Sequence, residues 1–424
     1  MLRTLVTLVI GALLGAAGLF AFYLRPVPVP AVVEHESLED AYAAFHRAVA
    51  EAGEFVQSHQ WYGTEREQAE AYRHIARAMI NSMIQGVLGD PSFPYFHEIG
   101  PYTKTGMDNS DQRYLSVIVD GAGEYRVRGE RGSSRRLEFS IYGEDPLSDT
   151  VASMDVSELQ IAEDGSFELI VGGEARDTNW LPLKPGPNRL LVRQIFSDWA
   201  HERPGDMRID RIDADRPPYP TLTRDDMALR IADATRIFAS NVERWPEYSR
   251  TRFDALMPAN VLTPPRTVGD TGGLEGRIMV GGHFYLEEDE ALVIAARPTQ
   301  ANYQGIQLGH HWWESLDYAN RQTSLTLDQA RVSSDGAIYY VIAHSDPGVA
   351  NWLDTEGFHR GVLMMRYDGL PSPQLTEAQE PVATRVKLAD VFDHLPPDEP
   401  RIAVQARADQ LAQRREAVQI RFGL

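Results

Sequence analysis

The sequence contains no cysteine among its 424 residues. This absence excludes disulfide bonds, thiolate nucleophiles, and zinc or iron–sulfur sites with cysteine ligands. Lysine is scarce, so arginine carries almost all of the positive charge. Acidic residues outnumber basic ones and give a net charge of −20, spread along the chain. Because nucleic-acid binding needs a basic surface, we expect no nucleic-acid partner.

Common catalytic motifs are also missing. The sequence has no GxSxG nucleophile elbow, no Walker loop, no GxGxxG fingerprint and no HExxH pair. The most common hydrolases, NTPases, nucleotide-cofactor enzymes and zinc peptidases are therefore not indicated. We predict no metal and no cofactor, while sites that use no local motif remain open.

One long hydrophobic run is present, at residues 5–24, directly after Arg3. About twenty apolar residues suffice to cross a bilayer as a helix. The run predicts an N-terminal transmembrane helix over 1–24, with an uncleaved anchor favoured over a signal peptide. A Pro-rich linker follows at 25–36. These features predict a single-pass protein of the cell membrane, with its main body periplasmic or extracellular.

The rest of the chain divides by its hydrophobic periodicity. Helical spacing predicts a hairpin of two helices, and alternation of apolar and polar residues predicts many short strands. A capping box at Thr223 opens a connecting helix that we expect Pro246 to close. The predicted units are a helical hairpin at 37–95, a first β-sandwich module at 96–220, a connecting helix at 221–262, a second β-sandwich module at 263–370, and a polar helical tail at 371–424.

One pattern occurs twice. Asp164-Gly165 precedes Asn179-Trp180-Leu181 and then Arg193; Asp335-Gly336 precedes Asn351-Trp352-Leu353 and then Arg366, at nearly equal spacing. Such a repeat indicates two copies of one β-module. The predicted fold is mainly β with helical additions, consisting of two β-sandwich or jelly-roll units.

The repeated residues have a structural interpretation. Asp-Gly is typical of a tight hairpin turn. We expect Asn179 and Asn351 to bond their own backbone, and Trp180 and Trp352 to be buried in the sandwich. The equivalent arginines, 193 and 366, would then bond the turn's carbonyls or pair with an acid.

Three stretches of the second module carry a family resemblance: Gly281–Ile294, Tyr303–Leu308 and Asp346–Asp354. Together with Asn179-Trp180-Leu181, they resemble the bacterial family known as domain of unknown function 1214. The resemblance implies a jelly-roll-like sandwich, sometimes in tandem, in proteins that are often exported. It brings no settled catalytic motif.

The most concentrated set of reactive side chains runs from His310 to Asp317. On a strand expected from Trp312 to Tyr318, adjacent residues point to opposite faces. His310, Trp312 and Trp313 are therefore candidates for binding a glycan, whose sugar rings stack on aromatic faces. Burial of both tryptophans would rule this out.

The second module also supplies three candidate catalytic carboxylates, Glu314, Asp317 and Asp346, because glycoside hydrolysis uses paired acids. A metal cluster of His283, His344 and His359 with Asp346 is a weaker alternative. The leading hypothesis is that the second module binds a glycan or similar polar ligand. The alternatives are a carbohydrate-active hydrolase and a structural, self-assembling protein.

Overall fold

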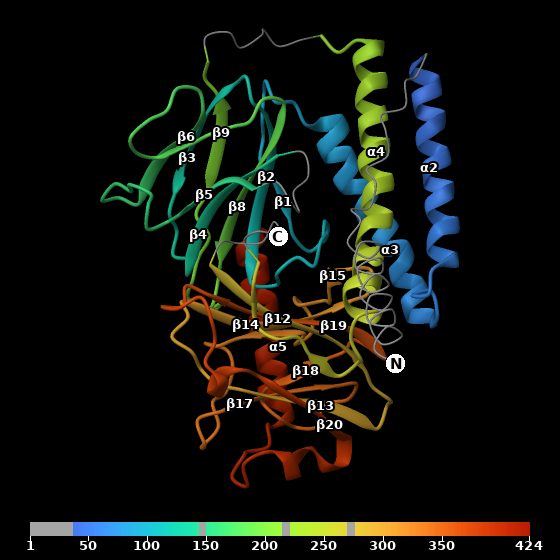
Figure 1. Ribbon diagram of the computed structural model, residues 1–424, viewed down its shortest axis with the longest axis vertical. Helices are drawn as coiled ribbons and strands as arrows, with labels where there is room; N and C mark the ends of the chain where they lie inside the picture. The colour runs from blue at the N-terminus through green and yellow to red at the C-terminus, as the bar shows by residue number, and fades with distance from the viewer. Residues whose placement is uncertain (1–36, 144–149, 214–220, 269–275) are drawn as a thin grey trace, which may run out of the picture.

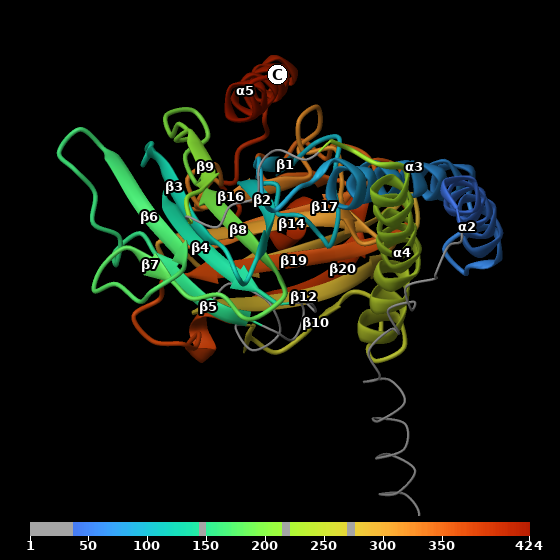
Figure 2. The same ribbon diagram turned by 90° about the horizontal axis from the view of Figure 1, so that it is seen from above.

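The computed structural model describes residues 37–143, 150–213, 221–268 and 276–424. Two β-sandwiches are joined by helices, and the mainly β character of the prediction is confirmed. In Figure 1 the first sandwich lies above the second, and two long helices run alongside the first. Figure 2 shows the same arrangement from above.

The first sandwich consists of a five-stranded sheet and a four-stranded sheet. The larger sheet has the order β1 (His97–Ile99), β2 (Gln112–Asp120), β8 (Pro187–Ile195), β4 (Arg136–Tyr142), β5 (Thr150–Asp155). The smaller sheet has the order β7 (Trp180–Leu181), β6 (Ser166–Gly172), β3 (Glu124–Glu130), β9 (Met207–Arg211).

The second sandwich repeats this plan. Its larger sheet has the order β10 (Val261–Leu262), β12 (Arg277–Tyr285), β19 (Arg360–Asp368), β14 (Tyr303–His310), β15 (Glu314–Ser315), with β11 (Arg266–Thr267) on β12 and β16 (Ser324–Thr326) on β14. The smaller sheet has the order β18 (Trp352–Asp354), β17 (Ile338–Ala343), β13 (Glu290–Ala296), β20 (Val382–Lys387). In each sandwich one parallel pair, β6–β7 or β17–β18, interrupts antiparallel pairing. This shared strand order gives the predicted jelly-roll-like modules a specific connectivity.

Alternation along the strands decides which side chains fill each core. In β8, Leu190 and Val192 face the core of the first sandwich, so Arg189, Leu191 and Arg193 face outward. The same alternation in β19 puts Leu363, Met365 and Tyr367 into the second core and turns Met364 and Arg366 outward.

Three helices form a separate layer with its own apolar core: α2 (Leu38–Ser58), α3 (Glu65–Ser82) and α4 (Arg224–Ser249). Ser37 caps α2, and capping boxes begin α3 and α4, as the sequence indicates for Ser37 and Thr223. The π-helical turns η1 (Met83–Leu88) and η2 (Arg250–Asp254) extend α3 and α4. The prediction that Pro246 ends α4 is wrong, because Pro246 lies inside the helix.

The C-terminal tail packs against both sandwiches. After the short turns η4 (Glu377–Gln379) and η5 (Leu388–His394), helix α5 (Val404–Phe422) packs along both sandwiches. Its buried Arg414 donates to Ser324 of the second sandwich, and its buried Arg421 donates to the Ser110 carbonyl beside the first. The helix therefore ties the two modules together.

The predicted transmembrane helix is the part of the fold prediction that is contradicted. Across 37–143, 150–213, 221–268 and 276–424, no helix is both long enough and apolar enough to cross a bilayer. The run at 5–24 on which the prediction was based lies outside the described residues. The single-pass membrane localisation that depended on it is withdrawn.

Candidate functional site

The expected strand from Trp312 to Tyr318 is instead a tight hairpin. Strand β14 ends at His310, a turn follows, and β15 begins at Glu314. Trp313 adopts a left-handed conformation in this turn, with φ of 65°, and its N–H donates to the His310 carbonyl. The hairpin inserts beneath the helical layer.

Both tryptophans of the hairpin are buried, with 1% and 4% of their surface exposed. Trp312 belongs to the apolar core of the helical layer, and its Nε1 donates to the Glu67 carbonyl of α3. Trp313 packs against Tyr248 and Phe253. Sugar stacking needs an open ring face, so the prediction that Trp312 and Trp313 form a glycan-binding surface is wrong.

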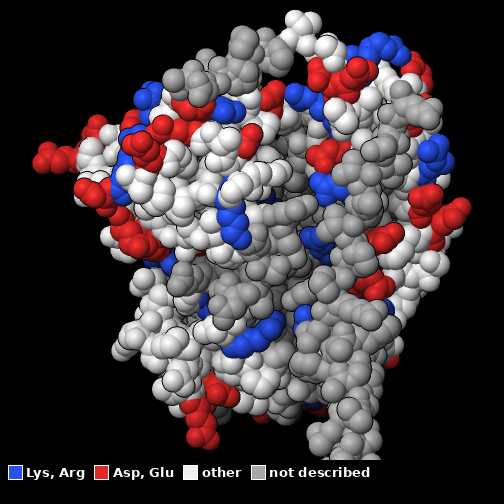
Figure 3. Space-filling model, turned by 45° about the horizontal axis from the view of Figure 1, so that its top comes forward, with Lys and Arg blue, Asp and Glu red and all other residues white. Residues whose placement is uncertain are grey.

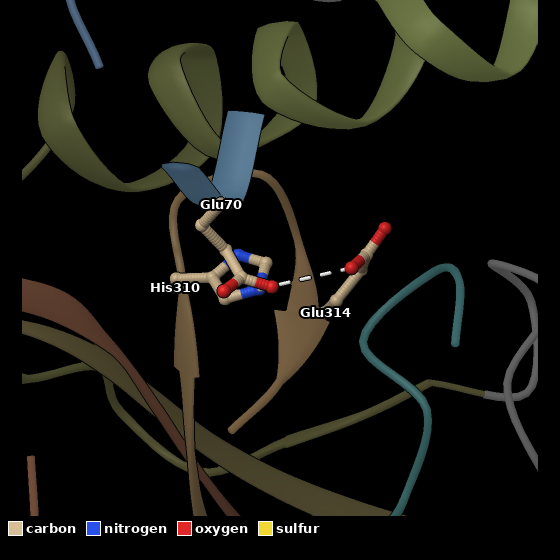
Figure 4. A group of neighbouring side chains, drawn as sticks. All are labelled: Glu70, His310 and Glu314. Carbon is tan, nitrogen blue, oxygen red and sulfur yellow. Dashed lines mark ion pairs between the residues drawn. The ribbon is translucent and has the colours of Figure 1, made fainter. Parts of the chain in front are cut away.

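His310 and Glu314 of the hairpin belong to a buried ionic network with side chains of α3 (Figure 4). His310 Nε2 lies 3.4 Å from Glu70 Oε1 and 3.7 Å from Glu314 Oε2. Arg77 donates to Glu70 Oε1 at 2.8 Å and also bonds Glu314. His74 Nδ1 lies 2.7 Å from Glu314 Oε1. His310, expected to touch a ligand, therefore belongs to an internal network.

This network is the one group of His and acidic residues, in the described part of the chain, that could hold a metal ion: one donor atom each from Glu70, His310 and Glu314 lie within 4.8 Å of one another. Arg77 already bonds both carboxylates, and its positive charge offsets part of theirs. Burial alone would raise the pKa of Glu70, but His310 and Arg77 outweigh it and hold that pKa well below its usual range. A divalent ion would have to displace Arg77.

The three candidate catalytic carboxylates contact different partners. Glu314 is enclosed in the network just described. Asp317 accepts from Asn320 within its own turn, at 2.8 Å. Asp346 binds Arg407 of α5 at 2.9 Å. None of these contacts pairs one candidate acid with another, as the hydrolase hypothesis requires.

The candidate metal histidines contact backbone carbonyls. A ring nitrogen of His344 and one of His359 lie 3.0 and 3.1 Å from the Leu286 carbonyl. His283 Nε2 lies 2.9 Å from the Met257 carbonyl. With Asp346 bound to α5, the four residues do not share a site.

The repeated pattern is structural in part, and its details differ from the prediction. Asn179 bonds the N–H and carbonyl of Gln160, and Asn351 does the same with Arg331, so each asparagine bridges to a neighbouring segment. The indoles of Trp180 and Trp352 donate to the carbonyls of residues 172 and 343, at 2.9 Å each. In both copies the following leucine fills the sandwich core. Trp352 packs on the outer face of its sheet, and Trp180 is half-buried.

The repeated arginines, 193 and 366, reach one shared cavity of about 900 Å³. One wall is the outer face of β2 and β8, the facing wall is α4, and the floor is the outer face of β12 and β19. The described lining contains eight arginines and three aspartates, with no lysine or glutamate. In Figure 3, basic side chains gather around this hollow in an otherwise acidic molecule.

Several of the lining arginines have carboxylate partners. Arg277 makes two hydrogen bonds of 2.7 Å to Asp368. Arg230 and Arg236 bind Asp90 and Asp233. The charge of these residues is balanced within the fold.

Arg189, at the first wall, is different. Among the described residues it makes no ion pair, and its guanidinium carbon lies 5.4 Å from the centre of the Tyr142 ring. Burial lowers the pKa of Arg189 to about 10, and the positive charges of Arg193 and Arg244 contribute. Arg193 donates to Tyr142 Oη at 2.7 Å and lies 3.4 Å from Glu138.

Arg366 likewise bonds neutral oxygens: the Gln307 side chain at 2.7 Å and the Met107 carbonyl at 3.1 Å. No carboxylate lies within ion-pair distance of it in the described segments. Burial lowers the pKa of Arg366, and the charge of Arg277 contributes. The charge of Asp111 acts on Arg366 from beyond ion-pair distance. Arg189 makes no ion pair among the described residues, and because a buried charge without a counter-charge is costly, the cavity is suited to receive negative charge beside it.

The charge of Arg189 also affects the stability of the protein in acid. Burial, with the charge of Arg189, lowers the pKa of His97 on β1 to about 4, against about 6.5 in an unfolded chain. Between these values the unfolded chain binds a proton that the folded chain does not, so stability should fall as pH decreases through this window. We expect His97→Gln to flatten the slope of unfolding free energy against pH between 6.5 and 4, measured by urea titration. An unchanged slope would contradict the assignment.

Comparisons with known proteins place this architecture. The family model described as a protein of unknown function (DUF1214) matches residues 138–196, which include Arg189 and Arg193. The crystal structure of an uncharacterised protein from Burkholderia cenocepacia is 30% identical, with a TM-score of 0.75, over 82% of this chain and 97% of that chain. The chain belongs to the DUF1214 family.

The other comparisons say less about this DUF1214 protein. A solved structure from Vibrio parahaemolyticus covers 82% of this chain and 99% of that chain, at 12% identity and a TM-score of 0.40, which is too remote to carry an argument. No curated protein matches the chain.

Sequence reasoning missed the residues that matter most in this DUF1214 cavity: Arg189, Arg244 and Trp245. One signal was present. Arg189 and Arg193 share the outward face of a strand whose other face is apolar, so two cations stand together on one side. The sequence did not show that α4 and the second sandwich would enclose this face.

Proposed function

We propose that this DUF1214 protein binds an anionic small molecule in the cavity between its two sandwiches. The observation that carries the proposal is the enclosed cationic wall of Arg189 and Arg193, in a chain whose net charge is −20. Guanidinium groups bind carboxylate and phosphate oxygens through paired N–H donors. An anion there would supply the counter-charge that Arg189 lacks among the described residues.

The size of the cavity supports a small-molecule ligand. Its volume, about 900 Å³, lies within the range of ~300–1,000 Å³ that is usual for ligand pockets. The position supports it too, because residues of both modules and of helix α4 line the cavity. The proposal keeps the polar ligand of the sequence-based hypothesis but moves it from the second module's hairpin to this cavity.

A ligand panel tests the proposal. We expect sulfate, citrate, benzoate or decanoate to raise the melting temperature, whereas benzamide and decanol, their uncharged counterparts, should raise it less. A ligand at about one hundred times its Kd should add about 2.7 kcal/mol to stability. Binding should weaken with added sodium chloride.

The matched control for the panel is Arg128→Gln. Arg128 of β3 forms an exposed ion pair with Asp210 of β9, and neither residue lines the cavity. This variant should respond to the anions as the unmodified protein does, and Arg189→Gln should respond less. The proposal fails if no anion stabilises the protein, or if both variants respond alike.

A further inference from the structure

We infer that the anion is an amphiphile, with an acidic group held between Arg189 and Arg193 of the β8 wall and Arg244 of the facing α4 wall, and an apolar body lying over the floor of the cavity. The inference rests on the proposed function and names the class of ligand. Three observations carry it: the fixed geometry of the arginines, the apolar character of the floor, and the volume between them.

The acidic group has a preformed receptor. Arg189 and Arg193 are four residues apart on β8, so both side chains leave the same face of the strand. Their guanidinium carbons lie 5.4 and 5.6 Å from the centre of the same Tyr142 ring, and the charge of Arg193 acts on Arg189. The charge of Arg244, from α4, acts on Arg189 across the cavity. Three cations thus converge on one region.

Beside Arg277 and Arg366, the floor also carries an apolar cluster. Met107, Met279, Met364 and Trp313 line it, and Trp245 and Tyr248 of α4 extend the same apolar cluster. Methionine side chains are flexible and polarisable, so they adapt to an apolar ligand better than rigid side chains do. A small inorganic anion would leave this surface in contact with water.

The volume leads to the same conclusion. A cavity of about 900 Å³ is far larger than a single small oxyanion, given that a water molecule occupies about 30 Å³ of liquid. The indole Nε1 of Trp245 is buried and has no hydrogen-bond partner in the described residues.

A chain-length series tests the inference by calorimetric titration of the full chain. The probes are acetate, hexanoate and decanoate, with decanol and sulfate as references, all below their micelle concentrations. We expect affinity to rise with chain length, by about fourfold for each methylene that is buried. Decanol should bind at least tenfold more weakly than decanoate.

A variant of the cavity floor distinguishes binding of the ligand's apolar body from binding of its acidic group. Met279, half-buried on β12, can be replaced by glutamine with little change in size. Met279→Gln should weaken decanoate severalfold and leave sulfate unchanged, with folding checked by circular dichroism. If affinity is independent of chain length while anions still bind, the amphiphile is wrong and the proposed function stands. If decanol binds as well as decanoate, or nothing binds, both are wrong.

Discussion

Replacement of Arg77 by methionine is expected to lower the free energy of unfolding by about 3–5 kcal/mol. Arg77 is the cation that bonds both Glu70 and Glu314, and all three side chains are buried. Methionine preserves most of the apolar contact but leaves the buried Glu314 without its arginine partner, while Glu70 keeps as arginine partners only the more exposed Arg66 and Arg73. Because a domain is stable by only about 5–15 kcal/mol, the loss should be plain in a urea unfolding curve.

The second carboxylate provides the control for this effect. In the double variant Arg77→Met with Glu314→Gln, one buried negative charge is removed together with its partner, so part of the stability should return. Arg128→Met removes an arginine of an exposed ion pair and should cost less than about 1 kcal/mol. A loss for Arg77→Met no greater than that of Arg128→Met would show that the network is not what holds the hairpin under α3.

The double variant Arg189→Gln with Arg193→Gln should weaken anion binding by about two to three orders of magnitude. Each charge-assisted hydrogen bond contributes about 1.5–3 kcal/mol, and glutamine retains hydrogen-bonding groups without the charge. Titration calorimetry with decanoate at low ionic strength measures the change. The salt dependence of binding should also become weaker in the variant.

Arg236→Gln is the matched control within the same cavity. Arg236 lines the wall formed by α4, and its guanidinium is paired with Asp233 at 2.6 Å, a closer contact than the 3.4 Å between Arg193 and Glu138. We expect this variant to bind decanoate within about threefold of the unmodified protein. Equal losses in the Arg236 variant and the double variant would point to general electrostatic attraction rather than a site at Arg189 and Arg193.

Local sequence patterns predicted the elements that depend on local chemistry. Ser37 and Thr223 begin helices because their hydroxyls accept backbone N–H groups within the same turn. Gly165 and Gly336 lie in turns at φ of 86° and 79°, as the Asp-Gly pairs indicated. The repeat predicted two copies of one β-module, and the two sandwiches share one strand order.

What the sequence could not supply depends on contacts between distant segments. Trp312 and Trp313 looked available because nothing local shows that α3 and η2 cover their hairpin. His310 and Glu314 looked reactive because their partners, Glu70 and Arg77, lie more than two hundred residues earlier in the chain.

From the sequence alone, the repeated arginines have a purely structural interpretation. The structure adds a second role for them. Arg193 and Arg366 occupy equivalent positions in two sandwiches that are packed differently around one cavity, so duplication of the fold brings both into a single site.

The most direct measurement is a crystal structure of the full chain soaked with a bromine-tipped decanoate, because the bromine can be located by its anomalous scattering. The account predicts carboxylate density against Arg189 and Arg193, and bromine beside the methionines and Trp313 of the cavity floor. An empty cavity at saturating probe, or a probe bound elsewhere on the molecule, would contradict it.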